Sequence, residues 1–418
     1  MYGIDFGTSN TVVSARRGSA ARVLELEGLG TVVPSLLYFE RDRPFSAGAE
    51  AREDYARALE RWKGERDLYA RFRFFQGLKF ALRDELFTGT AVFGRRWKAE
   101  ELVGAFLRVV KDRADRAAGA EIREAVVGRP VRLSADPASE AAILERYRSA
   151  CRLAGIETSH FVAEPIAAAA SLVGSLEGLV LVFDFGGGTL DIAVAELSGG
   201  KARVLASAGA ELGGYALDED LSRARIIRHF GYGSTFRTMT GRDLRLPSWI
   251  TNQVASFYAL PLSDIARTRE AIRELMFEAR SKEALRGLVA FLDANMAFGL
   301  FERVDEAKIG LSDGEEAAIR FAVPPHVAFE ERITRPQFEE LVAPRVAEAE
   351  RLVDRALAEA GVAAGAVARV LRVGGSSQVP AFAAMLERRF PGRVERGEVF
   401  TSISAGLTAA WEAGLGSD

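Results

Sequence analysis

The chain has 418 residues, 48% hydrophobic and 27% charged, which is typical of a globular protein long enough to form two or more domains. Its net charge of −3 gives no reason to expect binding to nucleic acid or to an anionic membrane. The single cysteine, Cys151, excludes an internal disulfide and suits a reducing cytoplasm. No apolar run approaches the ~20 residues of a membrane span, and Met1 leads directly into a strand, so we expect no signal peptide.

The first half of the chain alternates predicted strands and helices. Apolar runs predict strands over 2–15 (around a glycine turn), 31–39, 125–131 and 159–163. Apolar residues at helical spacing predict helices over 47–59, 100–118 and 138–153. A further helix begins at Glu164-Pro165, because proline fits the first helical turn. The stretch 61–93, rich in Phe and Arg, gives no clear assignment.

The second half repeats this alternation. A strand from Leu179 leads into a second glycine turn, and 218–300 is mostly helical, with breaks around 231–241 and at Pro247. Thr334 and Gln337 form a capping box for a helix that ends at Gly361. The remaining predicted elements are a strand over 367–373 and helices over 380–390 and 404–413. Strands mixed with helices indicate an α/β fold.

The most informative feature is a pair of related glycine turns. Residues 182–191 read VFDFGGGTLD, and residues 4–11 read IDFGTSNT. In each copy an apolar strand ends in Asp-Phe-Gly, followed by small residues and a second apolar run. Asp5 and Asp184 lie 184 − 5 = 179 residues apart, near the length of one domain. The pair predicts two related lobes with a nucleotide between them.

Each turn offers the chemistry of a phosphate site. Glycine lets a ligand approach the backbone, and successive N–H groups form a concavity that binds anions. Asp5 and Asp184 would be repelled by phosphate unless a cation lay between them, which indicates Mg²⁺ held through water. Thr8, Ser9 and Thr189 could donate hydroxyl hydrogen bonds to phosphate. The alternative, two ordinary glycine hairpins, is disfavoured by the two copies at this spacing.

Other signatures of catalytic or binding sites are missing from the sequence. Gly200-Lys201-Ala202 lacks the spacing of a Walker A loop, and no G-x-G-x-x-G follows a strand. The three histidines, His160, His229 and His326, show no zinc spacing. We interpret Cys151 as a core thiol rather than a nucleophile.

Six ordered motifs, with the pair of glycine turns counted as one, resemble the ATPase domain of heat-shock-protein-70 (DnaK-type) chaperones, within the actin-like ATPase superfamily. They are the two glycine turns with 163–169, Gly213-Gly214, 307–312, 333–340 and 373–380. The resemblance spans nearly the whole chain and is closest to the YegD-like group, whose members consist of this ATPase domain alone. It implies two RNase H-like lobes, residues 1–173 and 174–399, with a C-terminal helix in 400–418 packing back on the first lobe.

The resemblance also implies roles for individual residues. Asp5 and Asp184 would hold hydrated Mg²⁺, Thr189 would lie near the γ-phosphate, and Glu164 and Asp191 would position water. ATP or ADP would contact a further set, comprising Gly7, Thr8, Ser9, Asn10, Gly186, Gly187, Gly188, Thr189, Gly213, Gly214, Asp305, Lys308, Ser312, Gly374, Gly375 and Ser376. Purely structural roles remain possible for two of these residues. Glu164 could complement the positive end of a helix, and Lys308 could be a solvated lysine.

The family also places a lysine of the first lobe at the γ-phosphate. Lys79, among apolar neighbours, is the best candidate, with Lys63 and Lys98 as rivals. Three departures concern the adenine pocket, since Ile309 and Gln378 stand where the chaperones carry arginines and Asp305 is shorter than their usual glutamate. We expect a looser base site for that reason.

The sequence therefore predicts an ATPase switch with co-chaperone or client partners. The chain ends at Asp418, before the linker and peptide-binding domain of the chaperones, so we expect it not to hold peptides alone. Two alternatives within the superfamily remain open, a filament-forming ATPase and a small-molecule kinase using Asp191 or Glu164 as base.

Overall fold

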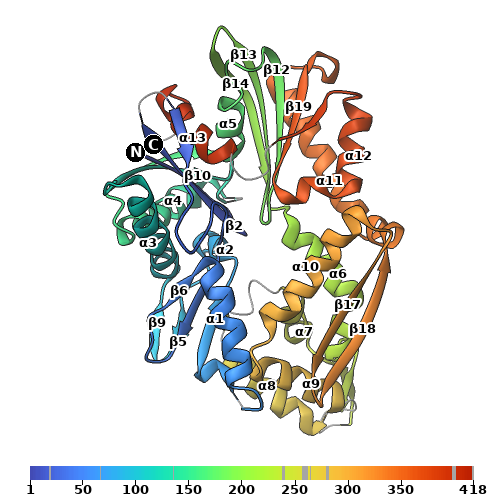
Figure 1. The fold of residues 1–418 in the computed structure, drawn as a ribbon. Coiled ribbons are helices and arrows are strands. Elements are labelled where there is room, and N and C mark those ends of the chain that lie inside the picture. Colours follow the sequence, from blue (N-terminus) through green and yellow to red (C-terminus); the bar gives the residue numbers. More distant parts are fainter. Residues whose placement is uncertain are drawn as a thin grey trace.

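The computed structural model describes residues 1–17, 20–65, 67–134, 136–237, 241–256, 262–263, 265–278, 282–397 and 402–416. Two mixed sheets and the helices around them form two halves that meet along the middle of the molecule (Figure 1). Both ends of the chain lie in the same half, next to each other.

The first sheet has six strands in the order β11-β10-β1-β2-β3, with β4 also pairing with β2. Its strands are β1 (Tyr2–Phe6), β2 (Asn10–Arg17), β3 (Ala20–Val23), β4 (Val33–Pro34), β10 (Glu124–Arg129) and β11 (Thr158–Ala163). The second sheet has five strands in the order β14-β13-β12-β19-β20. These are β12 (Gly178–Phe185), β13 (Leu190–Ser198), β14 (Lys201–Ala210), β19 (Arg369–Val373) and β20 (Val394–Arg396).

The two sheets share one topology. β1 pairs antiparallel with β2 and parallel with β10, just as β12 pairs antiparallel with β13 and parallel with β19. Read from one edge, β3-β2-β1-β10-β11 corresponds strand for strand to β14-β13-β12-β19-β20. The similarity between the two halves, which the two Asp-Phe-Gly turns indicated, therefore extends to all five paired strands of each sheet. In both sheets the glycine turn follows the central strand.

Helices α5 (Glu164–Ala170) and α13 (Ser402–Glu412) pack against each other between the two sheets. A buried cluster joins them to strands of both sheets through Val126, Val182 and Leu407. The helices approach closely, because a Cβ added to Gly406 would lie only 2.0 Å from the Ala167 carbonyl oxygen. The lobe boundaries predicted at 173 and 399 stay a prediction.

The remaining elements extend each half beyond its sheet. In the first half they are β5 (Leu37–Glu40), β6 (Ser46–Ala47), α1 (Gly48–Arg61), β7 (Phe72–Phe75), α2 (Leu78–Arg83), β8 (Thr90–Val92), β9 (Arg95–Trp97), α3 (Ala99–Ala118) and α4 (Pro137–Leu153). In the second half they are α6 (Gly214–Arg225), β15 (Thr235–Arg237), β16 (Asp243–Arg245), α7 (Ser248–Ala255), α8 (Ile265–Glu278), α9 (Lys282–Asp293), α10 (Ala297–Asp313), β17 (Glu316–Val323), β18 (Val327–Thr334), α11 (Arg335–Ala360) and α12 (Pro380–Arg389). Short 3₁₀ turns occupy 68–70, 227–230, 364–366 and 375–378.

The local signals of helix ends were good predictors. The Thr334–Gln337 capping box begins α11, and Gly361, with a φ of 65°, ends it. The prediction of one strand over 31–39 was wrong, because β4 and β5 join different sheets on either side of Ser35 and Leu36. The hairpin of β17 and β18 was not predicted, since Glu331 lies on the buried face and interrupts the apolar alternation of β18.

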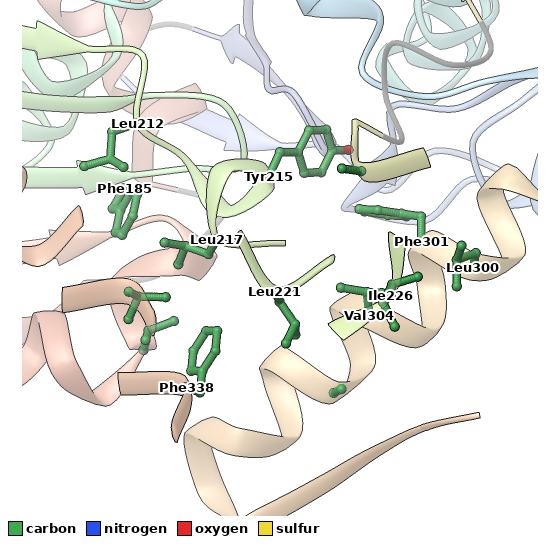
Figure 2. Close-up of a cluster of buried hydrophobic side chains, with 14 of the residues drawn as sticks. Phe185, Leu212, Tyr215, Leu217, Leu221, Ile226, Leu300, Phe301, Val304 and Phe338 are labelled. Carbon is green, nitrogen blue, oxygen red and sulfur yellow. The ribbon is translucent and has the colours of Figure 1, made fainter. Parts of the chain in front are cut away.

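A buried apolar cluster fixes α6 and α10 relative to the second sheet (Figure 2). Leu221 of α6 points into the space between Val304 of α10 and Phe338 at the start of α11, while Leu217 points toward Phe185 of β12. Since burial of each such side chain contributes about 1.5–3 kcal/mol, this packing holds α10 firmly. The position of α10 matters because residues along its whole length, from Phe298 to Asp313, line the cavity described below.

No described helix is by itself long and apolar enough to cross a membrane. Only α9 and α10 taken together meet the criteria of length and composition, and they are bent by 101° at their junction.

Leu221→Ala tests the packing of α6. Leu221 is 0% exposed, so we expect the substitution to lower the free energy of unfolding by about 2–5 kcal/mol. Leu86→Ala is the matched control, since Leu86 is 90% exposed. Urea unfolding followed by circular dichroism measures both, and equal effects of the two substitutions would contradict the packing described.

Candidate functional site

The two glycine turns face each other across the middle of the molecule. The turn between β1 and β2 contains Thr8 and Ser9, and the turn between β12 and β13 contains Gly187 and Gly188. A Cβ placed on Gly187 would lie 2.4 Å from Ser9 Oγ, and one on Gly188 would lie 2.6 Å from Thr8 Oγ1. The two glycine turns, which are distant in sequence, thus lie next to each other, as the sequence analysis predicted.

Gly213 and Gly214, at the start of α6, join these turns. A Cβ on Gly213 would lie 2.4 Å from the Gly187 carbonyl oxygen, which is backbone and cannot rotate away. The Gly214 N–H donates a hydrogen bond to the Gly186 carbonyl oxygen at 2.9 Å. The start of α6 therefore rests directly on the second glycine turn.

A fourth segment, after β19, completes the arrangement. Gly374 has a φ of +78°, and a Cβ there would lie 2.3 Å from the Phe185 carbonyl oxygen. Ser376 Oγ donates to the Gly186 carbonyl oxygen at 2.8 Å. Only glycine fits position 374, for reasons of both backbone conformation and space.

These segments enclose a cavity of about 720 Å³. Nearly every residue predicted from the sequence lines it, namely Asp5, Gly7, Thr8, Ser9, Asn10, Lys79, Glu164, Asp184, Gly186, Gly187, Gly188, Thr189, Gly214, Asp305, Lys308, Ser312, Gly374, Gly375 and Ser376. Asp191 and Gly213 do not line it and lie behind its wall.

A buried ion pair forms part of the wall of the cavity. Lys79 Nζ lies 2.5 Å from Glu164 Oε1, with side chains only 4% and 10% exposed. Burial alone would lower the pKa of Lys79, but Glu164, together with Tyr147 and Asp5, outweighs burial and raises the pKa above its usual value. The lysine is therefore held as a cation facing the cavity. The rivals lie elsewhere, since Lys63 is exposed beside Glu60 and Lys98 is exposed at the start of α3.

The carboxylates near this pair repel one another. Burial and then the charge of Glu164 raise the pKa of Asp5 to about 8, with Lys79 opposing. Burial and the charges of Glu164 and Asp191 likewise raise the pKa of Asp184. The site therefore holds more negative charge than Lys79 neutralises, and an added cation would be favoured there.

Asp191 lies just behind this cluster. Its Oδ1 accepts a hydrogen bond from the Val131 N–H at 2.8 Å, while its Oδ2 is buried without a partner. Burial and the charge of Glu164 raise the pKa of Asp191 to about 7. A buried oxygen without a partner is free to accept a hydrogen bond from water.

A second buried lysine lies on α10. Lys308 Nζ lies 2.8 Å from Asp218 Oδ1 and 2.8 Å from Asp305 Oδ1. Lys308 is 6% exposed, so the alternative of a solvated lysine is wrong. The sequence prediction missed Asp218, which follows the Gly213-Gly214 pair closely on α6 and is itself only 1% exposed.

Several side chains of the cavity wall were not predicted from the sequence. The departures Ile309 and Gln378 do line it, and Ile309 is 57% exposed. Unpredicted lining residues include Ser35, Arg52, Gln76, Tyr215, Phe298, Phe301, Arg372 and Arg396. None of these belongs to a motif, so no local signal identified them.

A model of the Hsp70 protein family matches residues 1–245 and 278–400, which is most of the chain. The chain belongs to the Hsp70 family. It is therefore a mixed α/β protein of the actin-like ATPase fold, as its two matching sheets indicate. Two segments are unmatched: 246–277, in the helical region between β16 and α9, and the C-terminal residues 401–418.

Curated Hsp70 relatives resemble the chain over almost its whole length. The chaperone protein HscA homolog of Azotobacter vinelandii is 27% identical and covers 100% of the chain. The chaperone protein DnaK of Trichormus variabilis is 28% identical over 91% of the chain, and DnaK of Deinococcus deserti is 26% identical over 99%. The chain spans 58%, 49% and 59% of these three proteins, respectively. The closer resemblance to the YegD-like group stays a prediction.

The Lys79–Glu164 pair can be tested through stability. Lys79→Met leaves Glu164 buried without its partner, and we expect the free energy of unfolding to fall by about 3–5 kcal/mol. Adding Glu164→Leu should restore part of that loss, because the unpaired charge is then gone. Urea unfolding of both single variants and the double variant, without nucleotide, gives the coupling. Strictly additive losses would show that the two side chains do not interact.

Proposed function

We propose that the chain binds ATP with Mg²⁺ in the central cavity and hydrolyses it, acting as a switch between an open and a closed arrangement of its two halves. One observation carries this proposal. Glycine turns at corresponding positions of two matching sheets meet at one cavity, together with a buried lysine and several carboxylates. Family membership supports it, because ATP binding is what the resemblance to heat-shock-protein-70 chaperones implies.

The two glycine turns would hold the phosphates. Backbone N–H groups of Gly186, Gly187 and Gly188 would donate to phosphate oxygens, as they do in anion-binding turns. The hydroxyls of Thr8 and Ser9 would donate from the opposite turn, which Gly188 and Gly187 approach closely. A phosphate chain would thereby tie the two halves together, so that its length would control their closure.

The carboxylates fit a magnesium ion held partly by water. Asp5 and Asp184 have raised pKa values because they are buried near Glu164, so a divalent cation would relieve the repulsion. Within the part of the chain that the structure describes, no three His, Cys, Asp or Glu side chains come together to ligate a metal directly. Mg²⁺ commonly binds through one or two carboxylates and keeps its waters. Bound there, the ion would neutralise charge on the transferring phosphate.

The hydrolytic step would depend on positioning. Lys79, fixed by Glu164, would place its charge against the γ-phosphate. Thr189 and Glu164 line the cavity, and Glu164 could accept a hydrogen bond from the attacking water. Asp191, behind the wall, would help to position that water through its hydrogen bond with Thr189. Such groups orient water and stabilise charge without forming a covalent intermediate.

The nucleoside would lie toward α10 and the turn after β19. Lys308 Nζ is fixed there by Asp218 and Asp305 and also contacts the Gly214 carbonyl oxygen at 3.5 Å, so a ribose hydroxyl would replace this long contact. Ser312, Gly214, Gly374, Gly375 and Ser376 line the same region. Asn10 and Gly7 line the phosphate side.

Partner proteins would sense the state of the switch. The matched relatives are named chaperones, and we propose co-chaperone or client proteins as partners of this chain. Its single cysteine, buried and unpaired, is compatible with the proposed reducing cytoplasm.

Hydrolysis of ATP tests the proposed function. We expect phosphate release that requires Mg²⁺ and falls at least ~100-fold in Asp184→Asn and in Thr189→Ala, because each removes a group that acts on the reacting phosphate. Asp112→Asn, an exposed change on α3, should leave the rate unaltered. Circular dichroism checks that all variants remain folded. Unchanged turnover in both site variants would refute the assignment.

A further inference from the structure

Two arginines line the cavity in addition to its lysines. Arg372 lies on β19 and Arg396 on β20, and the two are direct partners in the parallel pairing of these strands. Side chains of register partners point to the same face of a sheet, so the two guanidinium groups lie on one face. Both line the cavity, together with Gln378 and Pro380 at the start of α12.

Neither arginine has a carboxylate partner within the described ranges. No ion pair involves either residue there, whereas Arg369 on the same strand binds Glu395 at 2.8 Å. Arg372 donates from Nη1 to the Ser377 carbonyl oxygen, but its Nε is buried without a partner. An orphaned buried N–H costs free energy unless a ligand satisfies it.

The charges around Arg372 differ from those of the proposed phosphate site. Burial and then the charge of Arg396 lower the pKa of Arg372, and only Glu387 acts in the opposite sense. The carboxylates that surround Lys79 do not contribute. The pair therefore forms a separate cationic region, in which two like charges repel each other until an anion lies between them.

We propose that Arg372 and Arg396 form a second anion subsite of the cavity, which takes a phosphate or carboxylate group. Guanidinium groups are donors only, and they bind such oxyanions with two parallel hydrogen bonds. The anion is carried either by the nucleotide, at a point other than its triphosphate, or by a second small ligand beside it. This inference rests on the proposed function, because the nucleotide is taken to fill the rest of the cavity.

Phosphate binding to nucleotide-loaded protein tests the subsite. The chain is first saturated with a non-hydrolysable ATP analogue and Mg²⁺, and calorimetry records that step. Inorganic phosphate is then titrated, and we expect saturable binding that weakens roughly tenfold or more in Arg372→Leu and in Arg396→Gln, as loss of a charge-assisted hydrogen bond requires. Arg369→Gln, on the same strand but paired with Glu395, is the matched control and should bind normally.

A second arm identifies what carries the anion. ATP bearing an additional phosphate on its ribose should bind more tightly than ATP if the nucleotide carries it, and the gain should vanish in Arg372→Leu. Binding of free phosphate without any such gain would assign the subsite to a separate ligand. The subsite would be overturned if the ATP analogue binds but neither saturable phosphate binding nor tighter binding of the ribose-phosphorylated ATP is seen. A change in the variants only of the preference between ATP and GTP would overturn it as well. Failure of the analogue itself to bind would instead refute the proposed function.

Discussion

The close approach of backbone segments around Gly186–Gly188 determines the rest of this structure. The turn is contacted by the start of α6 and by the segment after β19, and both contacts exist only because no Cβ intervenes at Gly213 or Gly374. Each of those positions would otherwise place a side chain within 2.4 Å of a carbonyl oxygen. Three segments from distant parts of the second half therefore share one point, where a ligand can contact backbone from each of them.

Buried charge is the second constraint. Lys79 and Glu164 come from α2 and α5, which only the folded first half brings together. Asp5 and Asp184 lie beside this pair, and burial and the charge of Glu164 raise their pKa values, so their ionised forms are disfavoured in the empty site. Such an arrangement costs stability in the empty protein and favours binding of a cation, and the bound cation in turn lets a phosphate lie beside the carboxylates. A site that destabilises the empty protein and is stabilised by its bound ligands can use the binding free energy to close the two halves.

The sequence predicted the parts of the site that depend on local chemistry. Glycine turns, the Glu164-Pro165 helix start and the capping box at Thr334 follow from backbone conformation, which neighbouring residues decide. Lys79 could be preferred over Lys63 and Lys98 only through its apolar neighbours and the family resemblance. Arg372 and Arg396 belong to no motif and reach the cavity through sheet register, and Asp218 reaches Lys308 through helix packing; a single sequence encodes neither locally. The β17–β18 hairpin was missed for a similar reason, since pairing between two half-exposed strands leaves little pattern.

Equilibrium binding of ATP and Mg²⁺ to wild type and to Gly213→Ala is the most direct test of the central claim, that backbone contact between glycine segments forms the nucleotide site. The account predicts one ATP bound per chain and loss of that binding in Gly213→Ala, whose Cβ would lie 2.4 Å from backbone of the second turn. Gly365→Ala adds the same methyl group where nothing lies within 4 Å, and it should bind as wild type does. Absence of binding by the folded wild type, or equal affinity of the folded Gly213→Ala variant, would contradict the account.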